Sequence, residues 1–233
     1  MSPAAAKRRL LLGAAAACLF TACGPDTRTP EARGKAAFAS FNCKQCHRVG
    51  AEGGTLGPDL SFVGFRKSAP FLELWLSNPR GWQPSTQMPD FGFTERGRKD
   101  IVAYLSTLRG QAYAADKPWD APALKSDPAA RGRELYVRTG CGSCHGAQGQ
   151  GGFHNNNVPG GLIPALRETA STYTKAELER KIKAGVAHPQ KADPAGAEPM
   201  LAMPAWGEVL DDGAIAALAD YLLTLKPTKD NGF

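Results

Sequence analysis

Two copies of the pattern Cys-x-x-Cys-His constrain this sequence more than any other feature. They occupy residues 43–47 and 141–145. Two thiols at this spacing can each add to one vinyl group of a porphyrin, and the next residue can place its imidazole on the iron. A zinc site or a redox dithiol would use the cysteines but would leave the adjacent histidine unexplained. The sequence therefore predicts two covalently bound haem c groups. The predicted attachment residues are Cys43, Cys46, Cys141 and Cys144, and the predicted iron ligands are His47 and His145.

The two halves of the chain repeat one order of elements. Every position from Gly34 to His47 pairs with a position 98 residues later, from Gly132 to His145, and this indicates an internal duplication. Each half is expected to have a helix before the motif, a middle helix, and a final helix with an apolar stripe at helical spacing. The expected helices are 31–40, 70–76 and one that follows Thr94 in the first half, and one that follows Asp127, 175–184 and about 212–225 in the second.

The N-terminus has the features of an export signal. A basic run, residues 7–9, precedes an apolar stretch of 13 residues, 10–22, which is too short to span a bilayer comfortably. The stretch ends in Phe-Thr-Ala-Cys-Gly, which resembles a bacterial lipobox with Cys23 as the residue that becomes lipidated. Cys18 is an alternative lipidation site, and cleavage without a lipid is another outcome. Either route exports the protein, as haem attachment outside the cytoplasm requires.

Composition excludes several other classes of protein. The motifs and the leader account for all six cysteines, so neither a disulfide framework nor a catalytic cysteine is available. The net charge of +6 falls to +3 when Lys7, Arg8 and Arg9 leave with the leader. Four propionates on two haems would lower it further, to about −1. Because no basic run is interleaved with aromatic residues, we expect no nucleic-acid partner.

Both halves resemble class I cytochrome c domains, through the motifs and the repeated frame over residues 30–226. The resemblance implies an all-α fold of two tandem domains, each a few helices and loops wrapped around one covalent haem. It also implies that the first and last helices of a domain cross at a glycine beside an aromatic pair, where the missing Cβ lets the backbones touch. The matching residues are Gly34, Phe38 and Tyr104 in one half and Gly132, Tyr136 and Tyr221 in the other. We expect a signal peptide (1–23), a tether (24–29), a first domain (30–110), a linker (111–126), a second domain (127–227) and a tail (228–233).

The resemblance further implies a thioether as the sixth iron ligand and a proline carbonyl that holds the proximal histidine. Met88 and Met203 each precede a proline between the middle and last helices, and are the expected sixth ligands. The alternatives in the second half are Met200, His154 and His188, and the two histidines are expected in exposed loops. The expected carbonyls are those of Pro58 and Pro164, with Pro159 as a rival to Pro164.

With both axial positions filled, neither iron would have a free site for a substrate, so the resemblance implies an electron carrier rather than an enzyme. We expect an exported, lipid-anchored cytochrome on the periplasmic side of a bacterial membrane. Its upstream partner would be a dehydrogenase or a quinol-oxidising complex, and its downstream partner an oxidase or reductase of respiration. The alternatives are a haem enzyme of the thiosulfate dehydrogenase or peroxidase type, and a dedicated cytochrome subunit of a dehydrogenase. No cysteine remains for the distal ligand that such thiosulfate dehydrogenases use.

Overall fold

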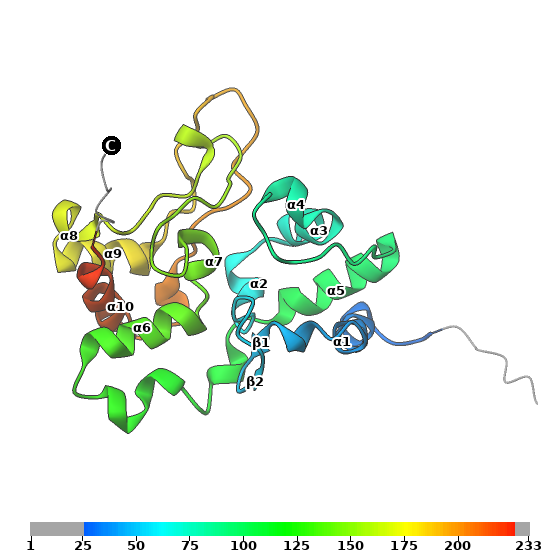
Figure 1. Cartoon of the computed structure of the whole chain (residues 1–233), viewed down its shortest axis with the longest axis horizontal. Helices are drawn as coiled ribbons and strands as arrows, with labels where there is room; N and C mark the ends of the chain where they lie inside the picture. Colours follow the sequence, from blue (N-terminus) through cyan, green and yellow to red (C-terminus); the bar gives the residue numbers. More distant parts are fainter. Residues whose placement is uncertain (1–25, 227–233) are drawn as a thin grey trace, which may run out of the picture.

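The protein, described here by a computed structural model of residues 26–226, consists of two mostly helical halves joined by an irregular segment (Figure 1). The expected all-α class and tandem arrangement are confirmed. The helices of the first half are α1 (Pro30–Ser40), α2 (Val63–Arg66), α3 (Ala69–Ser77), α4 (Pro79–Trp82) and α5 (Glu95–Thr107). Those of the second half are α6 (Pro128–Arg138), α7 (Gly142–His145), α8 (Thr169–Thr172), α9 (Lys175–Ala184) and α10 (Asp212–Thr224).

Short elements complete the two halves. Strands β1 (Arg48–Val49) and β2 (Glu52–Gly53) form a small antiparallel ribbon directly after the first motif, with Arg48 opposite Gly53. The 3-10 turns are η1 (Cys43–Gln45), η2 (Gln111–Tyr113), η3 (Pro118–Asp120), η4 (Pro122–Leu124), η5 (Pro159–Gly161) and η6 (Trp206–Glu208). The expected leader with Cys18 and Cys23, and the expected tail at 228–233, lie outside the described residues.

Helices α1 and α5 cross in close contact in the first half. Gly34 and Phe38 are buried one turn apart on the same face of α1. A Cβ at Gly34 would overlap the backbone of Asp100 and would lie 2.9 Å from Cβ of Tyr104, so only glycine allows this approach. The rings of Phe38 and Tyr104 meet edge to face beside the crossing, with centroids 5.4 Å apart. The expected crossing of the first and last helices is therefore confirmed for this half.

Helices α6 and α10 cross in the same way in the second half. A Cβ at Gly132 would lie 2.6 Å from the carbonyl carbon of Ala217 and 2.7 Å from Cβ of Tyr221. The rings of Tyr136 and Tyr221 again meet edge to face, at 5.3 Å. Leu135 and Tyr136 are almost completely buried here, which makes the crossing part of the core of this half. The crossing sets the position from which the chain enters the second motif.

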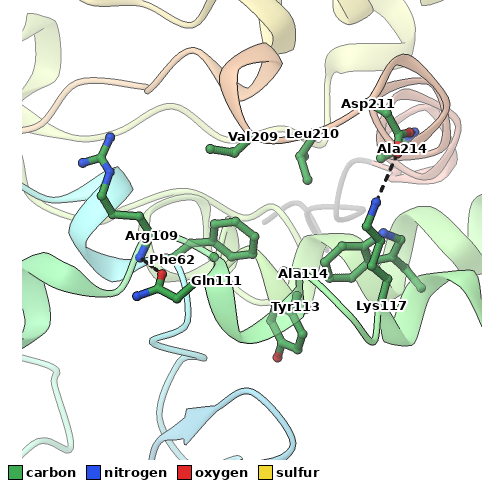
Figure 2. A pocket seen from close by; sticks show the side chains of 12 residues that line it. Phe62, Arg109, Gln111, Tyr113, Ala114, Lys117, Val209, Leu210, Asp211 and Ala214 are labelled. Atoms are coloured by element: carbon green, nitrogen blue, oxygen red, sulfur yellow. Dashed lines mark hydrogen bonds and ion pairs between the residues drawn. The ribbon is translucent and has the colours of Figure 1, made fainter.

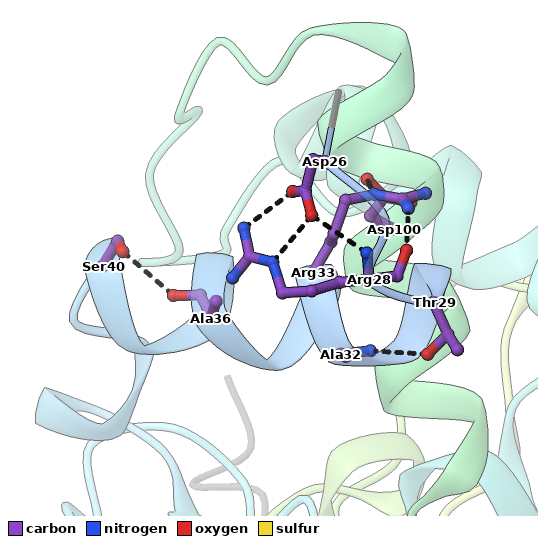
Figure 3. A network of polar contacts seen from close by, with 8 residues as sticks. All are labelled: Asp26, Arg28, Thr29, Ala32, Arg33, Ala36, Ser40 and Asp100. Atoms are coloured by element: carbon purple, nitrogen blue, oxygen red, sulfur yellow. Dashed lines mark hydrogen bonds and ion pairs between the residues drawn. The ribbon is translucent and has the colours of Figure 1, made fainter. Parts of the chain in front are cut away.

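One arginine of the duplicated frame is used differently in the two halves. Arg33 on α1 donates to both carboxylate oxygens of Asp100 on α5, at 2.7 and 2.8 Å (Figure 3). Residues of the expected tether join this network, because Asp26 pairs with Arg28 at 2.7 Å and the carbonyl of Arg28 accepts from Arg33. The arginine therefore ties the two crossing helices and the entering chain together.

The matching residue of the second half, Arg131, has a different set of partners. Ala217 occupies the place that Asp100 has in the first half, so no carboxylate is offered by α10 at this crossing. Arg131 instead binds Asp120 of the joining segment at 2.7 Å and the carbonyl of Gly213 at 2.7 Å. The duplicated arginine thus fastens the joining segment to the second half.

The segment expected as a linker, 111–126, contributes to the core. Tyr113 and Trp119 are buried, and their rings meet at 5.2 Å. They belong to one apolar cluster with Phe62 of the first half and Trp206 of the second, whose rings are 5.8 Å apart. The Tyr113 hydroxyl donates to Asp59 at 2.6 Å, and burial together with this carboxylate raises the pKa of Tyr113 to about 12. Packing of this kind fixes one half against the other.

The expected helices agree with the observed ones to within a few residues. Helix α9 begins at a capping box, in which Thr174 and Glu177 satisfy each other's backbone amides, and ends before Gly185. Helix α5 follows the N-cap residue Thr94, whose side chain accepts from Gly97 N. Helices α2, α4, α7 and α8 were not expected, because four residues are too few to show a periodic apolar pattern.

Candidate functional site

Both Cys-x-x-Cys-His motifs fold into the same turn. The amide of His47 donates to the carbonyl of Cys43 at 3.0 Å, and the amide of His145 donates to that of Cys141 at 3.0 Å. This helical turn places the two cysteines of a motif, three positions apart, on one side of the backbone. All four cysteines are half-buried. Two thiols facing one side, with the imidazole one position further on, match what attachment of a single porphyrin requires.

The imidazoles of both motifs are held by their Nδ1 atoms. Nδ1 of His47 is 2.9 Å from the carbonyl oxygen of Pro58, and Nδ1 of His145 is 3.0 Å from that of Pro164. A proton on Nδ1 leaves Nε2 free as an electron-pair donor. Burial lowers the pKa of both imidazoles, which favours the neutral form that binds iron. The carbonyl in the second half is that of Pro164 and not that of the rival Pro159.

The backbone at Gly57 passes directly along the imidazole of His47. A Cβ at Gly57 would lie 2.6 Å from Nδ1 of His47, so this glycine is what lets the chain reach Pro58. The thiols and the oriented imidazole fit a c-type haem, which these residues would hold in each half, and Gly57 adds a close backbone approach in the first half. The assignment of the individual ligands stays a prediction.

Met88, the expected sixth ligand of the first half, lies against the core of its own half. It packs on the same apolar cluster as Cys43. The indole Nε1 of Trp75 on α3 donates to Met88 Sδ at 2.9 Å, and the amide of Met88 donates to Thr86 Oγ1 at 3.2 Å. These contacts fix both the backbone and the sulfur of Met88. Trp75 was not identified from the sequence as a residue that contacts Met88.

Met203 has the corresponding place in the second half. It packs on the same apolar cluster as Cys141, whereas Met200 is not part of that cluster. Its carbonyl accepts from the amide of Val186 at 2.8 Å, which joins the segment to the end of α9. The grouping of Met203 with Cys141 supports it over Met200 as the sixth ligand, which stays a prediction.

The two remaining histidines differ in their surroundings. His188 is exposed, as expected. His154 is half-buried, so the expectation of an exposed loop is wrong for it: its ring meets that of Trp82 in the first half at 4.9 Å, and its carbonyl accepts from the Trp82 indole at 3.0 Å. The expectation failed because the residue that covers His154 is 72 positions away in the sequence.

Three consecutive asparagines, Asn155 to Asn157, hold the segment that leads to Met203. The Asn155 side chain bonds both the amide and the carbonyl of Leu201, at 3.1 and 2.9 Å. Asn156 accepts from the amide of Met200 at 2.7 Å, and Asn157 accepts from the amide of Asp193 at 2.8 Å. A side-chain amide pairs with backbone as another strand would. These asparagines belong to a polar insertion that the first half lacks, and they set the course of the segment that carries Met200 and Met203.

Two basic residues of the first half reach the second motif. Arg66 and Lys67, at the end of α2, are both buried. A guanidinium nitrogen of Arg66 donates to Ser143 Oγ at 2.6 Å, and Nζ of Lys67 is 2.9 Å from Cys144 Sγ. A Cβ at Gly140 would lie 2.6 Å from Cζ of Arg66, so a glycine before the motif makes room for the guanidinium. Sequence reasoning did not find these residues, because nothing in the motif reveals a partner 77 positions away.

A pocket lies where the joining segment meets both halves (Figure 2). Phe62, Tyr113 and Trp119 form its apolar wall, and Lys117 and Asp211 form an ion pair of 3.6 Å at its edge. Its lining contains no cysteine or histidine. The pocket belongs to the contact between the halves and not to the motifs.

Two further features of the described chain bear on metal and membrane sites. Among residues 26–226, no group of three or more His, Cys, Asp and Glu side chains is arranged to hold a metal ion without a porphyrin. No helix in the same range is long and apolar enough to cross a bilayer.

Comparison with known proteins gives the family. The family model for cytochrome c matches residues 31–109 and 129–226. The chain is similar to the Cbb3-type cytochrome c oxidase subunit CcoP of Azospirillum sp. (strain B510), with 26% identity over 207 residues, which is 82% of this chain and 61% of the relative. It is also similar to a subunit of the nitric oxide reductase of Stutzerimonas stutzeri, with 32% identity over 79 residues, 31% of this chain and 54% of the relative. The chain therefore covers less than two thirds of the length of these curated relatives.

A solved structure was also matched. A chain of the reducing HAO-like protein complex of Kuenenia stuttgartiensis aligns with 84% of this chain and 96% of its own length, at 16% identity and a TM-score of 0.29.

Proposed function

This chain belongs to the cytochrome c family, and from that premise we propose that it is a dihaem electron carrier of a bacterial respiratory chain. The observation that carries the proposal is the duplicated arrangement of the motif turns, in which each imidazole is held through Nδ1 by a proline carbonyl. Haem c, when bound, supplies a one-electron couple between ferric and ferrous iron. Electron transfer needs no open coordination position, in contrast to haem catalysis.

The residues of the chain would each have a defined part in this function. Cys43, Cys46, Cys141 and Cys144 would hold the porphyrins, and His47 and His145 would ligate the irons through Nε2. Met88 and Met203 would provide the sixth ligands. The carbonyls of Pro58 and Pro164 keep the imidazoles in one tautomer and one orientation, and would thereby make Nε2, the nitrogen left for the iron, more basic.

The cellular place and the partners are part of the proposal. Haem attachment outside the cytoplasm and the export signal at 1–23 support a location on the periplasmic side of a membrane, with a lipid on Cys23 as anchor. The partners would be a dehydrogenase or quinol-oxidising complex upstream, and an oxidase or reductase downstream. Both curated relatives carry names of respiratory subunits, which supports this setting.

The same names favour a second candidate function. Because both relatives are described as subunits, the chain could be the dedicated cytochrome subunit of one larger respiratory complex. A free carrier and a subunit differ in how strongly the partner is bound. Purification from the native membrane in mild detergent would separate them: a subunit elutes with its complex at stoichiometric amounts, and a carrier elutes alone.

The proposed function is tested by electron transfer with native membranes. The holoprotein, mixed with membranes and a respiratory substrate, is expected to become reduced at both haems and to be reoxidised when oxygen or a nitrogen oxide is admitted. Heat-treated membranes provide the control. If the isolated protein turns over thiosulfate or peroxide and exchanges no electrons with the membranes, it is an enzyme and not an electron carrier.

A further inference from the structure

Aromatic residues from both halves meet in a seam beside the two motifs. We define the seam as Lys67, Phe71, Trp75 and Trp82 of the first half with Phe153 and His154 of the second. In Figure 1 the loops of the second half that contain residues 146–165 and 186–205 extend towards α3 and α4. The rings of the seam are in contact, with centroid distances of 5.8 Å for Trp75 to Phe153 and 5.4 Å for Phe71 to Trp82. The seam therefore joins two segments that the duplication alone would leave independent.

A residue of the second half packs against Trp75, the tryptophan of the first half that contacts Met88. One side of the Trp75 indole packs on Phe153, and its Nε1 donates to Met88 Sδ at 2.9 Å. The loop that presents Phe153 is fastened on both sides of His154, by the Trp82 indole to the His154 carbonyl at 3.0 Å and by the His154 amide to Gln83 Oε1 at 3.1 Å. Movement of this loop would change the contact that orients the Met88 sulfur.

The first half, in turn, places a cation at the attachment site of the second. The ammonium of Lys67 lies over the ring of Phe71 at 4.6 Å and over that of Phe153 at 5.1 Å. Burial lowers the pKa of Lys67, and the two aromatic faces oppose this effect by favouring its charged form. The same ammonium is 2.9 Å from Cys144 Sγ, and its side chain is buried between the halves. A charge in such a place is little screened by solvent.

We propose that the seam makes each haem site depend on the opposite half, with Phe153 and His154 of the second half holding the Trp75–Met88 contact of the first, and Lys67 of the first half holding a positive charge at Cys144 of the second. The proposal rests on the proposed function, because it takes Met88 and Cys144 as haem-binding residues. Phe153, Trp75 and Lys67 are positioning residues, since each acts through another group. Their effect is on the reduction potentials, which hydrogen bonds to an axial ligand and nearby charges set.

The two parts of the proposal predict that a substitution in either half changes the haem of the other half. Loss of Phe153, in the second half, should change the potential of the first haem, because Trp75 loses its support. Loss of the Lys67 charge, in the first half, should lower the potential of the second haem, because a positive charge disfavours the additional charge of ferric iron. Two unit charges about 10 Å apart at an effective dielectric of 20 interact strongly enough to change an equilibrium roughly tenfold, and we take this as the size of the expected change in the ferrous-to-ferric ratio. A tenfold ratio corresponds to about 59 mV for one electron.

The experiment is a spectroelectrochemical titration of the dihaem protein and its variants. Met88→Ala and Met203→Ala first identify which midpoint belongs to which haem. Phe153→Ala is then expected to shift the midpoint of the first haem and to weaken its thioether-to-iron charge-transfer band, as Trp75→Phe should do directly. Lys67→Met is expected to lower the midpoint of the second haem, and Lys67→Arg to restore it. Matched controls are Leu162→Ala, a half-exposed apolar residue of the same insertion, and Lys183→Met, an exposed lysine of α9; neither should move a midpoint.

The results separate the inference from the function on which it rests. If the wild-type protein lacks two haems or the methionine bands, the proposed function fails before any variant is considered. If wild type is as proposed but Phe153→Ala leaves the first haem unchanged, or Lys67→Met leaves the second unchanged, the inference is overturned alone. Should Phe153→Ala not fold with two haems, Phe153→Leu replaces it. Leucine keeps part of the bulk and removes the ring, so this variant must shift the midpoint of the first haem by a smaller amount, and an unchanged midpoint overturns the inference.

Discussion

Replacing Gly132 with alanine should destabilise the second half by forcing α6 away from α10. The new Cβ would lie 2.6 Å from the carbonyl carbon of Ala217 and 2.7 Å from Cβ of Tyr221. Neither atom is at the end of a flexible side chain, so the helices themselves must move. Overpacking of this kind costs about 3 kcal/mol at the upper end of the usual range, and alanine recovers about 1 kcal/mol of helix propensity. The net loss is about 2 kcal/mol.

Thermal unfolding of the holoprotein, followed by the helical circular dichroism signal, measures this loss. For a unit of about 100 residues, 2 kcal/mol corresponds to a fall in Tm of roughly 8–16 °C. Gly213→Ala is the matched control: this glycine lies in α10, the partner helix of the same crossing, but its Cβ would meet nothing closer than 3.4 Å, so the Tm of the variant should stay the same or rise slightly. A Gly132→Ala protein with equal haem content that melts at or above the wild-type temperature would refute the role given to the crossing.

Three further predictions concern the ligands, acid stability and the potentials. Met88→Ala and Met203→Ala should each abolish the thioether-to-iron charge-transfer band of one haem and lower its potential. If the spectrum is unchanged after Met203→Ala but changes after Met200→Ala, the sixth ligand of the second half is Met200. The hydrogen bonds from Arg33 lower the pKa of Asp100. This pair therefore contributes to the free energy of unfolding above the unfolded pKa of about 3.9, and the contribution is lost as the pH falls through the folded pKa. In urea unfolding at a series of pH values, the free energy of unfolding of Asp100→Asn should fall less in acid than that of the wild type, and an equal fall would contradict this. A redox titration should resolve two midpoints, because Met88 sulfur accepts a hydrogen bond from an indole while Met203 is held through its carbonyl, and coincident midpoints would contradict this.

Local signals in the sequence were sufficient to predict the helices, the helix crossings and the motif turns within each half. Gly34 with Phe38, and Gly132 with Tyr136, repeat at a fixed offset, and a helix crossing needs a small residue beside a ring. Caps such as Thr94 mark where helices begin. The turns of the motifs follow from four or five adjacent residues. All of these depend on residues that are near in sequence or repeated in both halves.

The relation between the halves could not be predicted in this way. Trp75 and Trp82 were visible as aromatic residues before Met88, but their partners lie in an insertion of the other half. Lys67 has no repeated counterpart that would mark it as a neighbour of Cys144. The expected linker, 111–126, also gave no sign that Trp119 is buried, because the apolar cluster around Trp119 contains residues of both halves. Contacts between halves depend on the tertiary arrangement, and they have no periodicity to reveal them.

The central claim, two covalent haems on one chain, is tested most directly by counting them. Pyridine haemochrome spectra and intact mass of the protein, produced with the c-type maturation system, should give two haems per polypeptide. A variant with serine at Cys43 and Cys46 should retain one haem, and so should a variant with serine at Cys141 and Cys144. One haem or none on the wild-type chain, or haem that is removed by acidified acetone, would contradict the account.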